Sequence, residues 1–372
     1  MCRDNLAGCR RCVVTITDSI SPTSMPYNEF VLYRRINRPD ERQILIILFE
    51  SNIDRNVAYP QDLEIIRCGK DLCKLGKEIK RIANECEINN IQYVFHIHEG
   101  KSVIFFNVAT LGKYRSRIIY TIHSTYKNYP FHNKLFASLA TLISYRVVCV
   151  SETSYRYFPT WLKTIFPERI IAVQNGVDTD RINNVLSDYK RTTNQLFCLI
   201  YVARFVACKR HEILLQAISR IENCELLLIG KGPREEELRK LVAELGVGNR
   251  VEFVGALPRE KVFENIIQAD VYVSSSSYEG LPISVLEAMC CGTPCVVSDI
   301  EQHREIADQC EALITVKDSV DDWVEKLNEV RIESDENRKS IGYSLKQTVT
   351  DNFSLHRMHL NYEKIYQSIW DK

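Results

Sequence analysis

Short apolar runs rich in Val and Ile alternate along the chain with longer segments of helical periodicity. The runs are apolar at successive positions, as strands of a parallel sheet covered by helices on both faces require. Between them, Leu75, Ile79 and Ile82 are spaced by four and three residues, which describes one face of a helix. This alternation predicts an α/β fold built from doubly wound parallel sheets.

The runs divide into two series on either side of a polar segment, 183–194, which has little periodicity and is predicted to be a linker. The predicted strands are 13–17, 44–49, 63–67, 91–96, 118–122, 146–150 and 170–173, then 197–202, 225–229, 251–254, 271–274, 294–297 and 312–316. We therefore expect two Rossmann-like domains, 1–173 and 174–353, that face each other across a cleft. The remaining segment, 354–372, is predicted to be an amphipathic helix that packs back on the first domain.

Composition and charge exclude several classes of protein. The 372 residues hold 48 Lys and Arg and 48 Asp and Glu, which argues against a simple nucleic-acid-binding module. Apolar runs such as 44–49 are far too short to span a bilayer, and no signal-peptide stretch occurs in the first thirty residues. We therefore expect a cytoplasmic protein with free thiols, although Cys9-x-x-Cys12 with Cys2 resembles half of a zinc site.

The first cluster of chemically active residues follows the predicted strand 197–202. Arg204 and Lys209 lie just before a helix predicted to begin near His211. Two cations beside the unpaired N–H groups of a helix N-terminus would bind a diphosphate. The alternative is an ordinary pair of surface cations.

Two bare backbone turns follow the next strands. Gly230-Lys231-Gly232-Pro233 would let backbone approach a ligand, although it lacks a complete phosphate-loop pattern. Phe253-Val254-Gly255 ends the following strand with a turn that could read a base edge through its main-chain groups.

The most specific stretch, 274–289, joins a strand to a helix. Glu279 lies before the helix, and Gly280, Leu281, Pro282 and Ile283 lead into it. Glu287 lies two turns into the helix among apolar residues, where a carboxylate needs hydrogen-bond donors. Sugar hydroxyls would supply these donors, and the alternative is an ion pair with a neighbouring Lys or Arg.

These elements, in this order and spacing, resemble the family 4 retaining glycosyltransferases of the GT-B fold. The resemblance extends over roughly residues 90–370, and Gln174-Asn175-Gly176-Val177-Asp178 is similar to the segment that joins the domains of that family. It implies that Arg204 and Lys209 hold the donor diphosphate, and that Glu287 binds the ribose hydroxyls. It also implies that Glu279 contacts the donor sugar, together with Gly280, Leu281, Pro282 and Ile283.

The first half resembles the family more loosely. His123, in Thr121-Ile122-His123-Ser124, corresponds to a histidine that the family often places near the donor sugar; a packed histidine is the alternative. His98 is a weaker candidate, and His96 is expected on the opposite face of its strand. The loop 18–26, rich in hydroxyls, replaces the Gly-Gly loop of the family.

The resemblance implies transfer of a hexosyl or N-acetylhexosaminyl group, with retention, from a nucleotide diphosphate sugar. We expect UDP as the nucleotide, an acceptor in cell-surface glycan or glycolipid biosynthesis, and no cofactor. No metal is expected, because Asp178-Thr179-Asp180 lies in the hinge and the two cations supply the positive charge. The alternatives are a GT-B nucleotide-sugar epimerase and a non-catalytic nucleotide-sugar-binding subunit.

Charge is distributed unevenly between the halves. Residues 1–173 hold 24 Lys and Arg against 16 Asp and Glu, a net charge of +8, and the remainder carries −8. The cations Lys113, Arg115, Arg117, Lys127 and Lys134 are interleaved with Tyr114, Tyr126, Tyr129 and Phe131. This pattern favours an anionic or lipid-linked acceptor and a peripheral contact with the inner face of an anionic membrane. A soluble acceptor, with the charge serving solubility, is the alternative.

Overall fold

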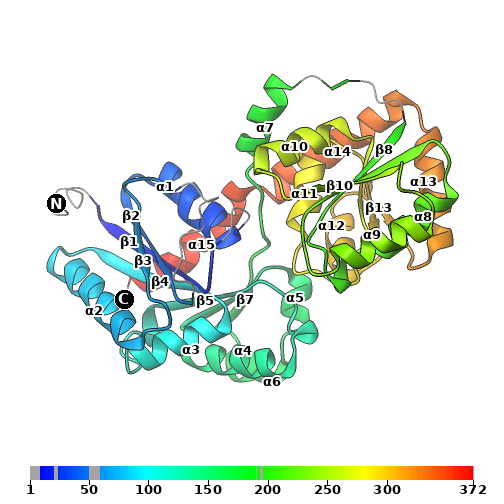
Figure 1. Ribbon diagram of the computed structural model, residues 1–372. Coiled ribbons are helices and arrows are strands. Elements are labelled where there is room, and N and C mark those ends of the chain that lie inside the picture. The colour runs from blue at the N-terminus through cyan, green and yellow to red at the C-terminus, as the bar shows by residue number, and fades with distance from the viewer. Residues whose placement is uncertain (1–8, 21–23, 50–58, 190, 193–195, 372) are drawn as a thin grey trace. The chain divides into compact units, whose positions relative to one another are not determined.

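The computed structural model describes residues 9–20, 24–49, 59–189, 191–192 and 196–371. They form two compact units (Figure 1). The first unit holds the chain up to Gln174 and again from His359, and the second holds Asn175–Met358. The chain therefore leaves the first unit once and returns to it once.

The first unit contains a seven-stranded parallel sheet with the strand order β3-β2-β1-β4-β5-β6-β7. Its strands are β1 (Arg11–Thr17), β2 (Glu41–Ile47), β3 (Glu64–Arg67), β4 (Gln92–His98), β5 (Ile118–Ile122), β6 (Arg146–Cys149) and β7 (Ile170–Ala172). Each of the seven apolar runs predicted in the first half corresponds to one of these strands.

Helices cover both faces of this sheet (Figure 1). They are α1 (Tyr33–Asn37), α2 (Leu72–Ile88), α3 (Gly100–Ala109), α4 (Phe131–Ile143), α5 (Glu152–Arg156), α6 (Thr160–Ile165) and α15 (Leu355–Trp370). The π-helix η2 (Pro26–Leu32) precedes α1, and η3 (Arg115–Arg117) and η4 (Tyr126–Asn128) are short 3₁₀ turns. Right-handed crossovers that advance in one direction along a sheet put their helices on one face, so α2, α3, α4 and α6 share a face.

The helix α2 forms as its sequence predicts. The Asp71 side chain accepts a hydrogen bond from the Lys74 backbone N–H at 2.9 Å and so caps the first turn. Leu75, Ile79 and Ile82 are fully buried in the core of the first unit. The helical face inferred from their spacing is confirmed.

The terminal helix α15 packs on the first unit, as predicted, and it lies on the face of the sheet opposite α2. The Tyr366 hydroxyl lies 2.8 Å from His96 Nδ1, and the Tyr362 hydroxyl lies 3.1 Å from Thr121 Oγ1. At the middle of α15, Glu363 forms an ion pair with the buried Arg34 guanidinium of α1 at 2.6 Å. Four residues at the start of α15 belong to the second unit, so the return to the first unit lies within the helix.

The second unit repeats the strand order with β10-β9-β8-β11-β12-β13, again all parallel. Its strands are β8 (Phe197–Val202), β9 (Cys224–Ile229), β10 (Val251–Gly255), β11 (Val271–Ser274), β12 (Cys295–Ser298) and β13 (Ile314–Val316). Its helices are α7 (Thr179–Asp188), α8 (His211–Arg220), α9 (Glu235–Glu244), α10 (Arg259–Gln268), α11 (Ile283–Cys290), α12 (Glu301–Ala307), α13 (Val320–Ile332) and α14 (Asp335–Asn352), with the turn η5 (Ala207–Lys209). The two parallel sheets confirm the α/β fold.

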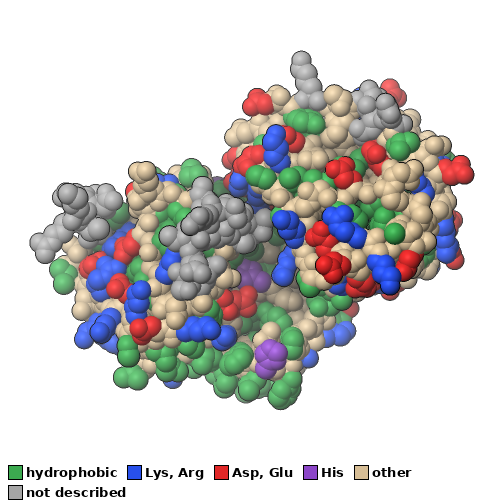
Figure 2. Space-filling model, viewed as in Figure 1, with side chains coloured by type: hydrophobic (Ala, Val, Ile, Leu, Met, Phe, Trp, Pro, Cys, Tyr) green, Lys and Arg blue, Asp and Glu red, His purple; other side chains and the backbone are tan. Residues whose placement is uncertain are grey.

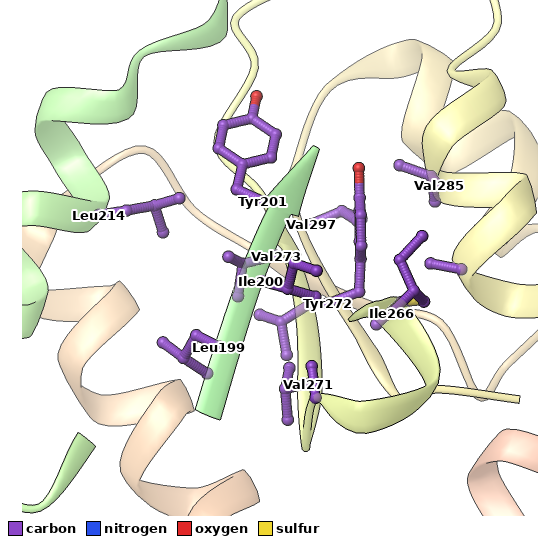
Figure 3. Close-up of a cluster of buried hydrophobic side chains, with 14 of the residues drawn as sticks. Leu199, Ile200, Tyr201, Leu214, Ile266, Val271, Tyr272, Val273, Val285 and Val297 are labelled. Atoms are coloured by element: carbon purple, nitrogen blue, oxygen red, sulfur yellow. The ribbon is translucent and has the colours of Figure 1, made fainter. Parts of the chain in front are cut away.

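The core of the second unit forms where the two central strands meet the covering helices. Figure 3 shows side chains of β8 and β11 together with Leu214 of α8, Ile266 of α10 and Val285 of α11. The buried Cys198 and Cys295 are free thiols in this core, and loss of water raises the pKa of both. They therefore pack as small hydrophobic residues, as predicted from the runs that contain them.

The predicted linker 183–194 is partly wrong, because 183–188 belong to α7. The Asp178 side chain accepts a hydrogen bond from the Arg181 backbone N–H at 3.0 Å and starts the helix. Ile182 is buried in the core of the second unit, and Val185 and Leu186 pack against it. Three apolar residues in a polar segment give too weak a helical periodicity to be detected in the sequence. Their packing against the core is nevertheless enough to stabilise a helix that has a side-chain cap.

Candidate functional site

The second sheet changes direction between β8 and β11, and open parallel sheets bind ligands at such a point, beyond the carboxyl ends of the strands. The loop after β8 carries Arg204 and Lys209, and the loop after β11 carries Glu279. Of the residues predicted to act on the donor diphosphate and sugar, the structure thus brings Arg204, Lys209 and Glu279 to adjacent loops of one unit, while His123 lies in the other unit.

Lys209 and Glu279 form an ion pair with 2.5 Å between Nζ and Oε1. The Ser276 hydroxyl donates a second hydrogen bond to the same carboxylate oxygen at 2.6 Å. Burial alone would raise the pKa of Glu279, but the adjacent ammonium and this hydroxyl bring it below its usual value. Burial alone would lower the pKa of Lys209, but the carboxylate raises it to about 12. Both groups are therefore charged at neutral pH.

Buried hydroxyls fix the backbone around Lys209. The Tyr201 and Ser275 hydroxyls each donate a hydrogen bond to the Lys209 carbonyl oxygen at 3.0 Å. Arg210, the next residue, adopts a left-handed conformation with φ 49°, and α8 begins at His211. The ammonium is therefore attached to a rigid turn at a helix N-terminus, as the sequence predicts.

Arg204 differs from Lys209 in its surroundings. Its side chain is exposed, and no ion pair joins it to another residue in the described part of the chain. The backbone around it is held, because the Ala203 N–H donates to the Ile229 carbonyl oxygen and the Phe205 N–H donates to that of Lys231. The guanidinium is thus a flexible cation on an anchored loop.

The glycine turn after β9 packs tightly against this loop. A Cβ atom on Gly230 would lie 2.0 Å from the Ala203 carbonyl oxygen, and Gly230 has φ +145°. A Cβ atom on Gly232 would lie 2.4 Å from the Phe205 carbonyl oxygen. Both glycines are therefore required by the contact between the two loops, a structural role that adds to the ligand contact predicted for them.

The turn after β10 joins the same set of loops. Gly255 has φ +83°, and its carbonyl oxygen accepts a hydrogen bond from the Gly230 N–H at 2.9 Å. Val254 lies half-buried beside it. The turns after β8, β9 and β10 are thus joined by backbone hydrogen bonds at one edge of the sheet.

Glu287 has the ion-pair partner that the sequence left open. Its Oε1 accepts hydrogen bonds from Arg259 Nε at 2.8 Å and from Nη2 at 2.5 Å. Pro282 forms the N-cap of α11 rather than part of its first turn, Ile283 is the first helical residue, and Leu281 is buried. Gly280 lies between Glu279 and this helix start.

Arg259 and His303 are two residues of this region that sequence reasoning missed. Arg259 is the first residue of α10 and directly follows the turn after β10. A cation soon after the end of a predicted strand was the sequence feature that could have identified it. His303 on α12 is fully buried, its Nδ1 lies 2.7 Å from the Ser298 carbonyl oxygen, and its Nε2 has no partner among the described residues. Burial lowers the pKa of His303 to about 4, against the opposing effect of the nearby Glu279.

The first unit has its own direction change, between β1 and β4, and histidines lie at its carboxyl edge. His123, half-buried after β5, has its Nε2 atom 2.8 Å from His98 Nδ1, and the two rings stack with 5.0 Å between centroids. Burial lowers the pKa of His123 to about 4, and it lowers the pKa of His98 well below its usual range. The pair is therefore neutral and shares one hydrogen-bonding proton.

The expectation that His96 faces away from His98 is wrong. Residues two apart in a strand point to the same face, and the His96 and His98 rings lie 4.3 Å apart. His96 is fully buried, with Nε2 2.7 Å from Thr121 Oγ1 and Nδ1 bonded to Tyr366. His96 therefore joins the sheet to α15, which is a structural role.

Two carboxylates at the same edge were also missed. Asp18, directly after β1, accepts a hydrogen bond from the Ser102 hydroxyl, and burial raises the pKa of Asp18. Glu99 follows β4 with φ 94°, and loss of water, together with the charge of Asp18, raises its pKa to about 7. The position of Asp18 at the end of the first predicted strand was the available signal. Residues 21–23 of the hydroxyl-rich loop lie outside the described residues.

The described residues contain no cluster of three or more His, Cys, Asp or Glu side chains arranged to hold a metal ion. Asp178 of the Asp-x-Asp pattern caps α7, as described above. The Cys2 of the possible zinc site lies outside the described residues.

Two family models match the chain. The model described as Glycosyltransferase Family 4 matches residues 54–181, and the model described as Glycosyl transferases group 1 matches residues 189–348. Together they extend over most of both units.

Several curated proteins are similar in sequence. N-acetyl-alpha-D-glucosaminyl L-malate synthase of Bacillus anthracis is 28% identical over 180 residues, 46% of this chain and 45% of the relative. The GPI3 subunit of phosphatidylinositol N-acetylglucosaminyltransferase from Saccharomyces cerevisiae is 24% identical over 242 residues, 62% of this chain and 52% of the relative. The chain thus aligns with about half the length of these relatives.

Solved structures share the fold over nearly the whole chain. Sucrose-phosphate synthase of Thermosynechococcus elongatus has a TM-score of 0.78 at 17% identity, with 97% of this chain and 100% of that chain covered. Anabaena HepE in complex with UDP and glucose has a TM-score of 0.76 at 15% identity, with 96% and 100% covered. The two parallel sheets, the matches in both units and this shared architecture lead to one conclusion: the chain belongs to family 4 of the glycosyltransferases and has the GT-B fold.

Proposed function

We propose that this protein transfers a hexosyl or N-acetylhexosaminyl group from a UDP-sugar to an acceptor hydroxyl, with retention at the anomeric carbon. The observation that carries the proposal is the grouping of Lys209, Arg204 and Glu279 where the second sheet changes direction. A diphosphate bound there would meet one fixed and one flexible cation. A sugar attached to it would meet an ionised carboxylate.

The two cations suit the chemistry of the leaving group. As the bond between the anomeric carbon and the diphosphate oxygen breaks, negative charge grows on the diphosphate. Lys209, held by the Tyr201 and Ser275 hydroxyls, is already in place to receive that charge. Because Arg204 is a second cation on the same loop, we propose that transfer needs no metal ion.

The charge state of Glu279 defines the role that we propose for it. Because its pKa lies below the usual value, the group is a hydrogen-bond acceptor at neutral pH and not a proton donor. Sugar hydroxyls are donors that fit such a carboxylate. Glu287, fixed by Arg259, would accept hydrogen bonds from the ribose hydroxyls. The donor site would also be lined by the backbone of Gly230, Gly232, Val254 and Gly255.

The similar proteins support this choice of donor. Relatives named for N-acetylglucosaminyl transfer favour an N-acetylhexosaminyl donor, and the Anabaena HepE structures contain UDP, UDP with glucose, or UDP-glucose. We propose that the acceptor binds at the carboxyl edge of the first sheet, with His123 near the reacting sugar. The acceptor class we propose is an anionic or lipid-linked molecule used in cell-surface glycan or glycolipid biosynthesis.

Ligand binding gives the first test. A bound donor raises thermal stability in proportion to its affinity, so UDP, GDP and ADP and their sugars would be compared by thermal shift. We expect the largest shift with UDP compounds. A shift with GDP or ADP compounds alone would reject the choice of nucleotide.

Turnover gives the second test and separates the alternative functions. A labelled UDP-sugar would be incubated with acceptor lipids and glycans, with and without a chelator, and the anomeric linkage of the product would be determined by NMR. Transfer with retention that survives the chelator is expected. Conversion of the sugar without transfer would indicate an epimerase, and binding without any turnover would indicate a non-catalytic role.

A further inference from the structure

The basic surplus of the first half is confined to one segment. Residues 100–167 contain nine Lys and Arg and only one acidic residue, Glu152, a net charge of +8. Acidic and basic residues balance in the rest of the first half, since 1–173 as a whole also carries +8. This segment includes α3, α4 and α6, which lie on the α2 side of the first sheet, and the short helix α5.

The helix α4 has its large apolar residues on the outside. Phe131 and Leu135 are 84% and 51% exposed, and Leu139 and Leu142 are exposed on the same side. The residues that α4 buries are small, namely Ala137, Ala140 and Thr141. A helix that only had to pack on a sheet would bury its leucines, so this arrangement indicates that a second surface covers α4.

The exposed apolar surface continues onto the neighbouring helices. Of the fourteen large apolar side chains exposed in the described part of the chain, eight lie between 108 and 165. Beside those of α4 these are Val108, Leu111, Trp161 and Ile165, from the end of α3 and from α6. Figure 2 shows apolar side chains gathered over these helices at the lower edge of the first unit. We call this surface, with α4 at its centre, the α4 face.

The aromatic residues expected to interleave with the cations are mostly elsewhere. Tyr114 is buried, and Tyr126 and Tyr129 pack against the core of the first unit. Of the four, Phe131 alone reaches the α4 face. Lys113 and Arg115 are exposed, so the cations remain at the surface while the apolar contacts come from leucines and Trp161.

We propose that the α4 face docks on an anionic lipid bilayer, with α4 lying in the plane of the interface. An amphipathic helix with leucine and aromatic residues on one side, and cations around it, binds such an interface. The charge disfavours a second copy of this chain as the occupant, because two such faces would bring like charges together. No helix of the described chain is long and apolar enough to cross a membrane.

The docking surface stands independently of catalysis, but its consequence rests on the proposed function. If the protein transfers sugar, a first unit held at a lipid surface presents its acceptor site to acceptors embedded in that surface. The inference thus deepens the proposed acceptor from an anionic or lipid-linked molecule to a lipid-linked one.

Vesicle sedimentation tests the proposal. The full chain would be mixed with phosphatidylcholine vesicles and with vesicles that also contain phosphatidylglycerol, at low and high salt. We expect binding to the anionic vesicles that weakens with salt. The double variant Leu135→Gln/Leu139→Gln should lower the affinity about tenfold or more, and Lys113→Gln/Arg115→Gln several-fold.

Matched controls separate docking from folding and from sugar transfer. Ile332→Gln/Tyr343→Gln alters two apolar side chains of the second unit, 81% and 68% exposed, and should bind vesicles like the parent. The thermal shift with UDP reports the fold and donor site of every variant. Equal binding by the parent and the α4 variant, or no binding by the parent, would overturn the proposal.

The same variants test the competing occupant. A dimer in light scattering that the α4 variant dissociates would assign the face to a second copy and overturn the proposal. Vesicle binding that depends on α4, without any response to UDP-sugars, would support docking while rejecting the proposed function.

Discussion

Lys209 and Glu279, seventy positions apart in the chain, form an ion pair at the point where the second sheet changes direction. The pair fixes the charge of both side chains and holds the loops after β8 and β11 together. A donor that binds between these loops would exchange part of this contact for contacts with its diphosphate and sugar. Each member of the pair can therefore be tested for a separate role.

Replacing Lys209 or Arg204 by Ala should lower turnover about a hundredfold or more, because each would counter charge that develops on the departing diphosphate. Lys240→Ala, on the exposed surface of α9, is the control for loss of a single cation. Steady-state rates with saturating donor measure the effect. Near-normal turnover in the Lys209→Ala/Arg204→Ala double variant would contradict the assignment.

Glu279→Gln and Glu287→Gln should separate sugar contacts from nucleotide contacts. Glu287→Gln weakens the contact with Arg259 and should reduce the affinity for free UDP and for the donor alike. Glu279→Gln should leave the affinity for free UDP unchanged and lower the rate of sugar transfer. Calorimetry with UDP and with UDP-sugar measures both, and Glu252→Gln, exposed on β10, is the control. Equal loss of UDP affinity in both variants would show that the roles are not divided.

His98 should act through His123. His98→Leu removes the hydrogen bond to His123 and should lower turnover about tenfold, while His98→Gln, which can still donate a hydrogen bond, should retain more activity. Neither change should alter UDP affinity, because the UDP site proposed here lies in the second unit. The kcat values of the parent, His98→Gln and His98→Leu proteins test this role. Identical kcat values for the two variants would mean that the hydrogen bond between His98 and His123 does not affect turnover.

Gly230→Ala should destabilise the protein by at least about 2 kcal/mol, since the added Cβ meets the Ala203 carbonyl oxygen and the backbone φ disfavours side chains. Gly248→Ala, where nothing lies within 4 Å, should change stability by less than about 0.5 kcal/mol. Urea unfolding compares the two. A Gly230→Ala protein as stable as the parent would mean that the loops after β8 and β9 separate easily.

Stability should fall as the pH drops below about 6.5, the pKa of histidine in an unfolded chain. Burial lowers the pKa of His96, so the folded state stays neutral there while the unfolded state takes up a proton. Each such histidine lowers the free energy of unfolding by about 1.4 kcal/mol for each pH unit below about 6.5, until the pH reaches the pKa of that histidine in the folded state. His96→Asn should therefore show a shallower decline in urea stability between pH 7 and pH 5, and an unchanged slope would reject this cause.

Much of the fold follows from the sequence because the signals involved are local. Thirteen apolar runs predicted thirteen strands, since a strand buried on both faces needs consecutive apolar residues. The buried face of α2 was also predicted from the spacing of its apolar residues. The linker prediction failed at 183–188 because a side-chain cap and three core contacts outweigh a polar composition.

The order of residues along the chain sets which side chains follow the strand ends, and therefore which could gather at each sheet edge. Which of these side chains meet depends on how the chain folds in three dimensions. The tertiary structure pairs Lys209 with Glu279, Arg259 with Glu287 and His98 with His123, and it turns the leucines of α4 outward. The physical reason is that apolar periodicity is written along one segment, whereas an ion pair, a shared proton or an exposed face depends on distances between segments far apart in the chain.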